Sequence, residues 1–190
     1  MNLPKEFEYY LNQGIIKKCI INKSRAKFLI EESEKSAKGL YKRIEMMNID
    51  EYNANSMVKD CYDIIMSLIR AKLLLTGYCS AGQFAHEAEI SYLKKFGFPD
   101  NEISFINDLR YFRNSVNYYG KILNIEYAQQ VIDFTKKMHT KLINMIEDNL
   151  ELNEKTKKET EKARKEIKAG KVISQEEAEK RYNNYSKNKL

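Results

Sequence analysis

Glycine and proline are sparse in this chain and stand at only a few positions. Its 190 residues include two prolines and seven glycines, and long segments contain neither residue. Both residues disfavour the interior of a helix, so segments that lack them favour helix formation. The sequence therefore predicts an all-α protein in which the few glycines lie where one helix ends and the next begins. No strand of useful length is expected.

Six helices are expected, and in the four longest of them apolar residues recur every three or four positions, which is the spacing of amphipathic helices. We expect helices over about 4–12, 50–76, 83–95, 103–118 and 124–149. A further helix is expected to bury apolar residues from Ala26 to Ile44, with Asn22 or Ser24 as its N-cap, because either side chain can accept from free backbone N–H groups. Residues 14–18 are expected to be a connector between the first two helices.

Residues 151–190 differ in composition from the rest of the chain. They contain 12 Lys or Arg and 8 Asp or Glu, so they contribute 12 − 8 = +4 of the net charge of +6. Glu and Lys recur there in pairs that can support an exposed helix. The sequence thus predicts a helical bundle over 1–150 and a charged C-terminal extension over 151–190, partly helical or disordered.

Composition excludes several classes of protein. No apolar run approaches the roughly 20 residues that a membrane-spanning helix needs, and the first residues show no signal peptide. The three cysteines are odd in number and widely spaced, so we expect reduced thiols in a cytoplasmic protein. With only two histidines, a metal site is not expected, and no cofactor is predicted. The net charge of +6 is a mild indication of an anionic partner.

The segment 103–118 carries an unusual polar face. At 100° per residue, five polar residues cluster on one side of this helix: Asn107, Arg110, Arg113, Asn114 and Asn117. The opposite side is apolar. Arginine can bind a phosphate with two N–H groups, and asparagine supplies donors and acceptors, so one interpretation is a groove for anions such as RNA phosphates. The alternative is a buried or dimer-facing polar network, in which the arginines pair with Asp60 or Asp63.

The segment 108–120, with the sequence DLRYFRNSVNYYG, resembles the signature helix of HEPN domains. It is closest to archaeal members that carry Leu-Arg-x-x-Arg-Asn-x-x-x-Tyr-x-Gly. The order of the helices, Gly77-Tyr78 followed by His86-Glu87, and the segments 14–18 and 22–26 also resemble this family. The resemblance covers about residues 1–150. It implies an antiparallel helical bundle that pairs as a homodimer.

Many HEPN proteins are metal-independent ribonucleases, often toxins in toxin–antitoxin or abortive-infection systems. Their motif is an arginine, a polar residue, three to five further residues and a histidine. The arginine holds the scissile phosphate and the histidine moves the proton. Arg113 and Asn114 match this motif, whereas Tyr118 stands where the histidine is expected. Tyrosine has an ordinary pKa near 10 and is a poor base at neutral pH.

The resemblance implies catalytic positions at Arg113, Asn114 and Tyr118, and binding positions at Arg110, Asn117 and His86. We therefore expect a protein of a prokaryotic defence or toxin–antitoxin system that binds RNA or a nucleotide and is degenerate as a ribonuclease. An antitoxin or a nucleotidyltransferase is a further expected partner. Two alternatives stay open. One is an active ribonuclease in which Tyr118 or His86 replaces the missing histidine, and the other is a non-catalytic helical dimerisation or interaction module.

Overall fold

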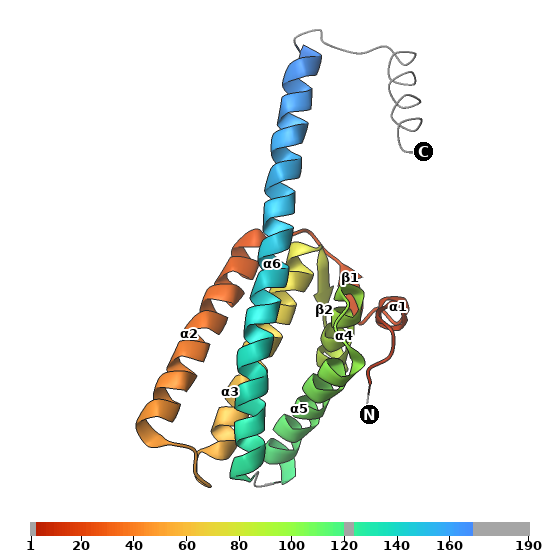
Figure 1. Ribbon diagram of the computed structural model, residues 1–190. Helices are drawn as coiled ribbons and strands as arrows, with labels where there is room; N and C mark the ends of the chain where they lie inside the picture. Colours follow the sequence, from red (N-terminus) through yellow and green to blue (C-terminus); the bar gives the residue numbers. More distant parts are fainter. Residues whose placement is uncertain (1–2, 120–123, 169–190) are drawn as a thin grey trace, which may run out of the picture. The chain divides into compact units, whose positions relative to one another are not determined.

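The computed structural model describes residues 3–119 and 124–168, and most of them are helical (Figure 1). Side chains are described for 3–113 and 124–147. The elements in chain order are α1 (Phe7–Asn12), β1 (Ile16–Lys18), α2 (Lys23–Met47), α3 (Ala54–Leu75), β2 (Tyr78–Ser80), α4 (Ala85–Ser91), the 3-10 helix η1 (Tyr92–Phe96), α5 (Asp100–Tyr119) and α6 (Ile125–Lys168). The prediction of a predominantly helical protein is confirmed.

The chain divides into two compact units, residues 1–146 and 147–190. The core and all the side-chain clusters considered below belong to the first unit. Helix α6 was expected to end near 149, but its backbone stays helical to Lys168. The rest of the expected C-terminal extension, 169–190, lies outside the described residues. Within the described ranges, no helix is both long enough and apolar enough to cross a membrane.

Helix α3 is at the centre of the core. Cys61, Ile65 and Leu68 are fully buried, and α2, α4 and α5 all pack against α3. Helix α6 also contacts it, because the ammonium group of Lys72 donates to the carbonyl oxygen of Met145 at 2.8 Å. Figure 1 shows α2, α3, α5 and the first part of α6 side by side. Each fully buried Leu or Ile contributes about 1.5–3 kcal/mol to folding, so the contacts of α3 dominate the stability of this unit.

The segment 14–18 is more than a connector, so that expectation is wrong. It contains β1, which pairs antiparallel with β2 so that Lys17 lies opposite Cys79. Just beyond the strands, the N–H of Cys19 donates to the carbonyl of Gly77 at 2.8 Å. Strands of three residues are too short to show a two-residue alternation in the sequence. Their pairing depends on contacts between distant segments of the chain.

The segment 83–95, expected as one α-helix, forms α4 and then the tighter turn η1. Gly97, with φ of +71°, ends this turn in the left-handed region that favours glycine. Within η1 the hydroxyl of Tyr92 donates to Oγ1 of Thr76 at 2.6 Å, which joins the turn to the end of α3. Helix α4 is therefore only two turns long. It nevertheless carries His86, Glu87 and Glu89.

Other helix starts follow from local capping. Asn22, rather than Ser24, caps α2, because its Oδ1 accepts from the N–H of Arg25 at 2.9 Å. Helices α1, α3 and α5 begin three or four residues away from the expected positions. For α3 the cause is Asp50, whose carboxylate accepts from the N–H groups of the next turn before the helix starts.

Candidate functional site

Arg110, from the predicted polar face of α5, is paired with a carboxylate of α4. Its Nη2 donates to Oε2 of Glu87 at 3.0 Å, and its Nε donates to Oδ1 of Asn107 at 3.0 Å. The side chain of Arg110 is only 12% exposed. Arg110 therefore joins α4 to α5 in a contact that is largely shielded from solvent.

Glu87 also accepts a hydrogen bond from α1. The hydroxyl of Tyr10 donates to Oε1 of Glu87 at 2.8 Å, and the Tyr10 oxygen accepts from the N–H of Lys5 at 3.1 Å. Burial, and then the hydrogen bond to Glu87, raises the pKa of Tyr10 well above its ordinary value. One carboxylate thus holds together three helices of the first unit: α1, α4 and α5.

His86 lies on the same short helix α4 and contacts α3 through both ring nitrogens. Its Nε2 is 2.8 Å from Nη2 of Arg70, and its Nδ1 is 2.8 Å from the hydroxyl oxygen of Tyr62. An arginine can only donate, so Nε2 must be the acceptor. In the neutral ring Nδ1 then carries the proton and donates to Tyr62. The two contacts together select one tautomer.

The pKa of His86 is lowered, first by burial of the ring and then by the positive charge of Arg70. Arg113 also lowers it, whereas Glu89 and Asp63 raise it. The imidazole is therefore neutral at neutral pH. A neutral ring is the form that can accept a proton or a hydrogen bond from a bound molecule.

Arg70 connects His86 to the small sheet. Its Nε donates to both carboxylate oxygens of Glu89, at 2.9 and 3.0 Å. The hydroxyl of Ser80, on β2, donates to the same carboxylate at 2.6 Å. The side chain of Glu89 is only 4% exposed, so its charge is balanced almost entirely by Arg70.

Arg113, on α5, lies close to the same Tyr62 side chain that contacts His86. The guanidinium carbon of Arg113 is 5.6 Å from the centre of the Tyr62 ring, a distance that suits a cation–π contact. We call Tyr62, Arg70, His86 and Arg113 the Arg113–His86 cluster. It draws on three helices, so residues far apart in the sequence meet at one place.

The ion pair of Arg113 with Asp63 is loose. The distance from Nε of Arg113 to Oδ1 of Asp63 is 3.4 Å, longer than an ordinary N–H···O hydrogen bond. The buried Nε has no hydrogen-bond acceptor among the described residues. The side chain of Asp63 is 57% exposed. This pairing is one that we anticipated for a polar network. The other anticipated carboxylate, Asp60, instead pairs with Arg43 on α2.

The structure thus separates the predicted site residues into two clusters. Arg113 and His86 share Tyr62, whereas Arg110 belongs to the contacts of Glu87. Asn114, Asn117 and Tyr118 are in the helical backbone of α5, but their side chains lie outside the described residues. The sequence does not point to Tyr62 and Arg70, because on α3 they lie within an apolar segment whose only expected polar contacts are those of Asp60 and Asp63. Arg70 is one of several charged residues in this segment, so its charge alone does not identify it.

Comparison with known proteins adds no family assignment. No family model matches the chain, and no curated protein matches it. No group of three or more His, Cys, Asp or Glu that could hold a metal ion is found in the part of the chain that the structure describes. The geometry of the two clusters is therefore the basis of the functional argument.

Proposed function

We propose that the chain is a HEPN-like module that binds RNA or a nucleotide at the Arg113–His86 cluster, in a prokaryotic defence or toxin–antitoxin system. The observation that carries the proposal is that Arg113 and His86, on two different helices, share Tyr62 as a neighbour. The HEPN-like segment 108–120 supplies the arginine of this pair. The expected antiparallel bundle and homodimer belong to the same proposal.

The state of Arg113 supports a role in phosphate binding. Its contact with Asp63 is long and partly exposed, and ion pairs that solvent reaches contribute only about 0–1 kcal/mol. A phosphate oxygen can therefore replace Asp63 at little cost. The two oxygens of a phosphate also match the fork of the guanidinium.

Arg110 has a different role in this proposal. Its hydrogen bond to Glu87 is shielded, and removal of the carboxylate would leave a charged group with little access to water. We therefore assign Arg110 to the positioning of α4, and hence of His86, relative to α5. Arg113 is the arginine that contacts the phosphate.

An active metal-independent ribonuclease is the second candidate function. The lowered pKa of His86 favours it, because a neutral imidazole can act as a general base toward a 2′-hydroxyl. In the structure, however, the lone pair of Nε2 accepts from Arg70. Cleavage requires this hydrogen bond to open, whereas binding at Arg113 does not. Binding is therefore the function that the geometry favours.

The decisive test measures the affinity of the purified full-length chain for a fluorescently labelled RNA by anisotropy. We expect Arg113→Ala to weaken binding at least about tenfold, because it removes a charged hydrogen-bond donor. Arg43→Ala is the matched control, since Arg43 also pairs with a partly exposed aspartate but lies on α2. An equal loss in both variants would indicate bulk charge alone. Unchanged binding in Arg113→Ala would refute the proposed site.

The same samples separate binding from cleavage. Incubation with RNA in EDTA is expected to leave the RNA intact. Fragments with 2′,3′-cyclic phosphate ends that disappear in His86→Gln would instead establish the ribonuclease. Light scattering of the same preparations tests the proposed homodimer, and a monomeric mass at all concentrations would contradict it.

A further inference from the structure

Two of the three cysteines are neighbours across the small sheet. Lys17 is directly opposite Cys79 in the antiparallel pair of β1 and β2. Cys19 follows two residues after Lys17, and its N–H donates to the carbonyl oxygen of Gly77 at 2.8 Å, so the pairing continues one residue beyond β1. Side chains two residues apart on a strand point to the same face. Cys19 and Cys79 are therefore diagonal neighbours on one face of the sheet.

The two thiols contact each other. The pKa of Cys19 is raised, first by burial and then by a hydrogen bond with the thiol of Cys79. Both cysteines are free and half-buried, so solvent reaches each of them. The hydrogen bond brings the two sulfur atoms close without a covalent bond. A short further approach would bring them to the distance of about 2.0 Å between the sulfur atoms of a disulfide.

The connector between β1 and α2 allows this approach. Residues 19–22 lie outside both elements, and the side chain of Ile20 is 92% exposed. A small shift of Cys19 therefore leaves the helices of the core in place.

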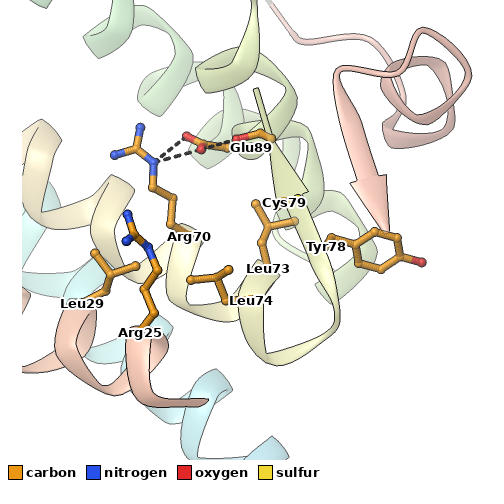
Figure 2. A pocket seen from close by; sticks show the side chains of 9 residues that line it. Arg25, Leu29, Arg70, Leu73, Leu74, Tyr78, Cys79 and Glu89 are labelled. Atoms are coloured by element: carbon orange, nitrogen blue, oxygen red, sulfur yellow. Dashed lines mark hydrogen bonds and ion pairs between the residues drawn. The ribbon is translucent and has the colours of Figure 1, made fainter. Parts of the chain in front are cut away.

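Cys79 is also reachable from a pocket. It lines a cavity of about 310 Å³ between α2, the end of α3, β2 and α4 (Figure 2). Arg25 and Arg70 line the same cavity, and the exposed residue Lys17 is opposite Cys79 in the sheet. Reactive cysteines lie in partly exposed surroundings that carry positive charge. The position of Cys79 is therefore one that a small oxidant can enter.

Cys61, on α3, differs from this pair. Its side chain is fully buried, and burial raises the pKa of its thiol to about 12. Thiols that are buried in this way are inert. The chain thus carries its own internal control, since two of its thiols are accessible and in contact whereas the third is neither.

We propose that Cys19 and Cys79 form a reversible disulfide when the chain meets a peroxide, and that this disulfide locks β1 to β2. The site does not depend on RNA binding at the Arg113–His86 cluster. In reducing surroundings, protein disulfides are usually transient and serve redox sensing or catalysis. A pair of adjacent, accessible thiols on a small sheet fits the first of these roles.

The raised pKa keeps Cys19 protonated, so Cys79 takes the first step. The thiolate sulfur of Cys79 attacks one oxygen of hydrogen peroxide, the O–O bond breaks, and hydroxide leaves, which gives a sulfenic acid. The sulfur of Cys19 then loses its proton and attacks the sulfenic sulfur, the S–O bond breaks, and a second hydroxide leaves. The two protons released by the thiols convert both hydroxides to water. Two electrons pass from the sulfur atoms to the peroxide.

The test is peptide mapping of the reduced full-length chain after exposure to an equimolar amount of hydrogen peroxide. Trypsin places the three cysteines in separate peptides, 19–23, 60–70 and 73–94. We expect a link between 19–23 and 73–94 that dithiothreitol reverses, with a free thiol in 60–70. Free thiols in all three peptides, under conditions that oxidise glutathione, would overturn the proposal. A link that includes 60–70, or one between two chains, would also overturn it.

The unfolded chain is the control for geometry. Cys61 and Cys79 are 79 − 61 = 18 residues apart, whereas Cys19 and Cys79 are 79 − 19 = 60 residues apart. A shorter loop closes at a lower cost in entropy, so oxidation in urea should favour the link between Cys61 and Cys79. The native chain should reverse this preference. The same preferred link in both states would contradict a pair selected by the fold.

Three variants test the order of the steps. In Cys19→Ser, Cys79 can form the sulfenic acid but not the disulfide, so dimedone should label peptide 73–94. In Cys79→Ser, Cys19 should stay reduced, and Cys61→Ala should form the link like the parent chain. Dimedone labelling of Cys19 in Cys79→Ser, at the level seen for Cys79 in Cys19→Ser, would refute the assigned order.

Thermal unfolding of the parent chain tests the lock between the strands. A disulfide restricts the unfolded chain, so oxidation should raise the melting temperature by at least about 5 °C. Dithiothreitol should remove this increase. Equal melting temperatures of the oxidised and reduced chains would contradict the proposed effect of the disulfide on β1 and β2.

Discussion

Arg70 donates from Nη2 to Nε2 of His86 across 2.8 Å. Only an unprotonated Nε2 can accept this hydrogen bond. Protonation of His86 would place an N–H group against a guanidinium group and convert an attractive contact into a repulsive one. Arg70 thus both donates this hydrogen bond and, together with burial, lowers the pKa of His86. Protonation of His86 should therefore destabilise this part of the core at low pH.

The first prediction is a loss of stability on mild acidification. Burial lowers the pKa of His86 and also that of His139 below the ordinary value of 6.5. At pH values between 6.5 and the lowered pKa values of the folded state, the unfolded chain therefore binds more protons than the folded chain. The free energy of unfolding should be independent of these groups well above pH 6.5 and should fall as pH drops below it. Urea unfolding between pH 8 and pH 5 measures this slope.

The double variant His86→Gln, His139→Gln is the control for that experiment. Carboxylates have ordinary pKa values near 4, so they contribute little above pH 5. Removal of both imidazoles should flatten the dependence on pH in this window. An equally steep fall in the double variant would assign the acid sensitivity to other groups.

The second prediction concerns Glu87, the carboxylate that joins α1, α4 and α5. In Glu87→Ala, the shielded guanidinium of Arg110 loses its counter-charge and the hydroxyl of Tyr10 loses its acceptor. We expect a loss of about 3 kcal/mol in the free energy of unfolding, because an unpaired charge in a shielded site is strongly destabilising. Urea unfolding at pH 7 is the measurement.

Arg43→Ala is the comparison for Glu87→Ala. Arg43 pairs with Asp60 across α2 and α3, but both side chains are well exposed. Removal of the Arg43 side chain should lower the free energy of unfolding by less than about 1 kcal/mol. The double variant Glu87→Ala, Arg110→Ala should be less destabilised than the sum of its single variants. Additive losses would show that Glu87 and Arg110 do not act as a pair.

The third prediction tests the turn between α3 and β2. Gly77 has φ of +78°, and a Cβ there would lie 3.2 Å from the carbonyl oxygen of Cys19. Gly77→Ala therefore combines strain of the left-handed backbone, about 1–2 kcal/mol, with a close contact against Cys19, the residue after β1. Gly14 has φ of +68° but open space around its Cβ position, so Gly14→Ala incurs only the backbone strain. In thermal unfolding, the melting temperature of Gly77→Ala should be lower than that of Gly14→Ala. Equal melting temperatures would exclude a contribution from the contact with Cys19.

Much of the helical architecture was predictable, because it depends on local patterns. The apolar spacing in α2, α3, α5 and α6 and the scarcity of glycine identified four long helices before any contact was known. The same reasoning failed where elements are short. The strands β1 and β2 and the turn η1 contain too few residues to show a period, and their formation depends on tertiary contacts.

The candidate site was only partly predictable for a related reason. Arg110 and Arg113 share one face of a helix, so the sequence places them together, yet the structure gives them different partners. Arg110 meets Glu87 on α4, whereas Arg113 approaches Asp63 and Tyr62 on α3. The residues that hold His86, namely Tyr62 and Arg70, showed no motif because their role depends on the packing of α3 against α4.

By itself, the sequence determined the helical character of this protein and the polar face of α5, since both follow from the residues within one segment. The tertiary structure decided which charges are paired, which histidine tautomer is present, and that Arg25 and Arg70 line one pocket. These properties depend on distances between helices and on exclusion of water. A periodicity or motif within a single segment cannot predict these properties.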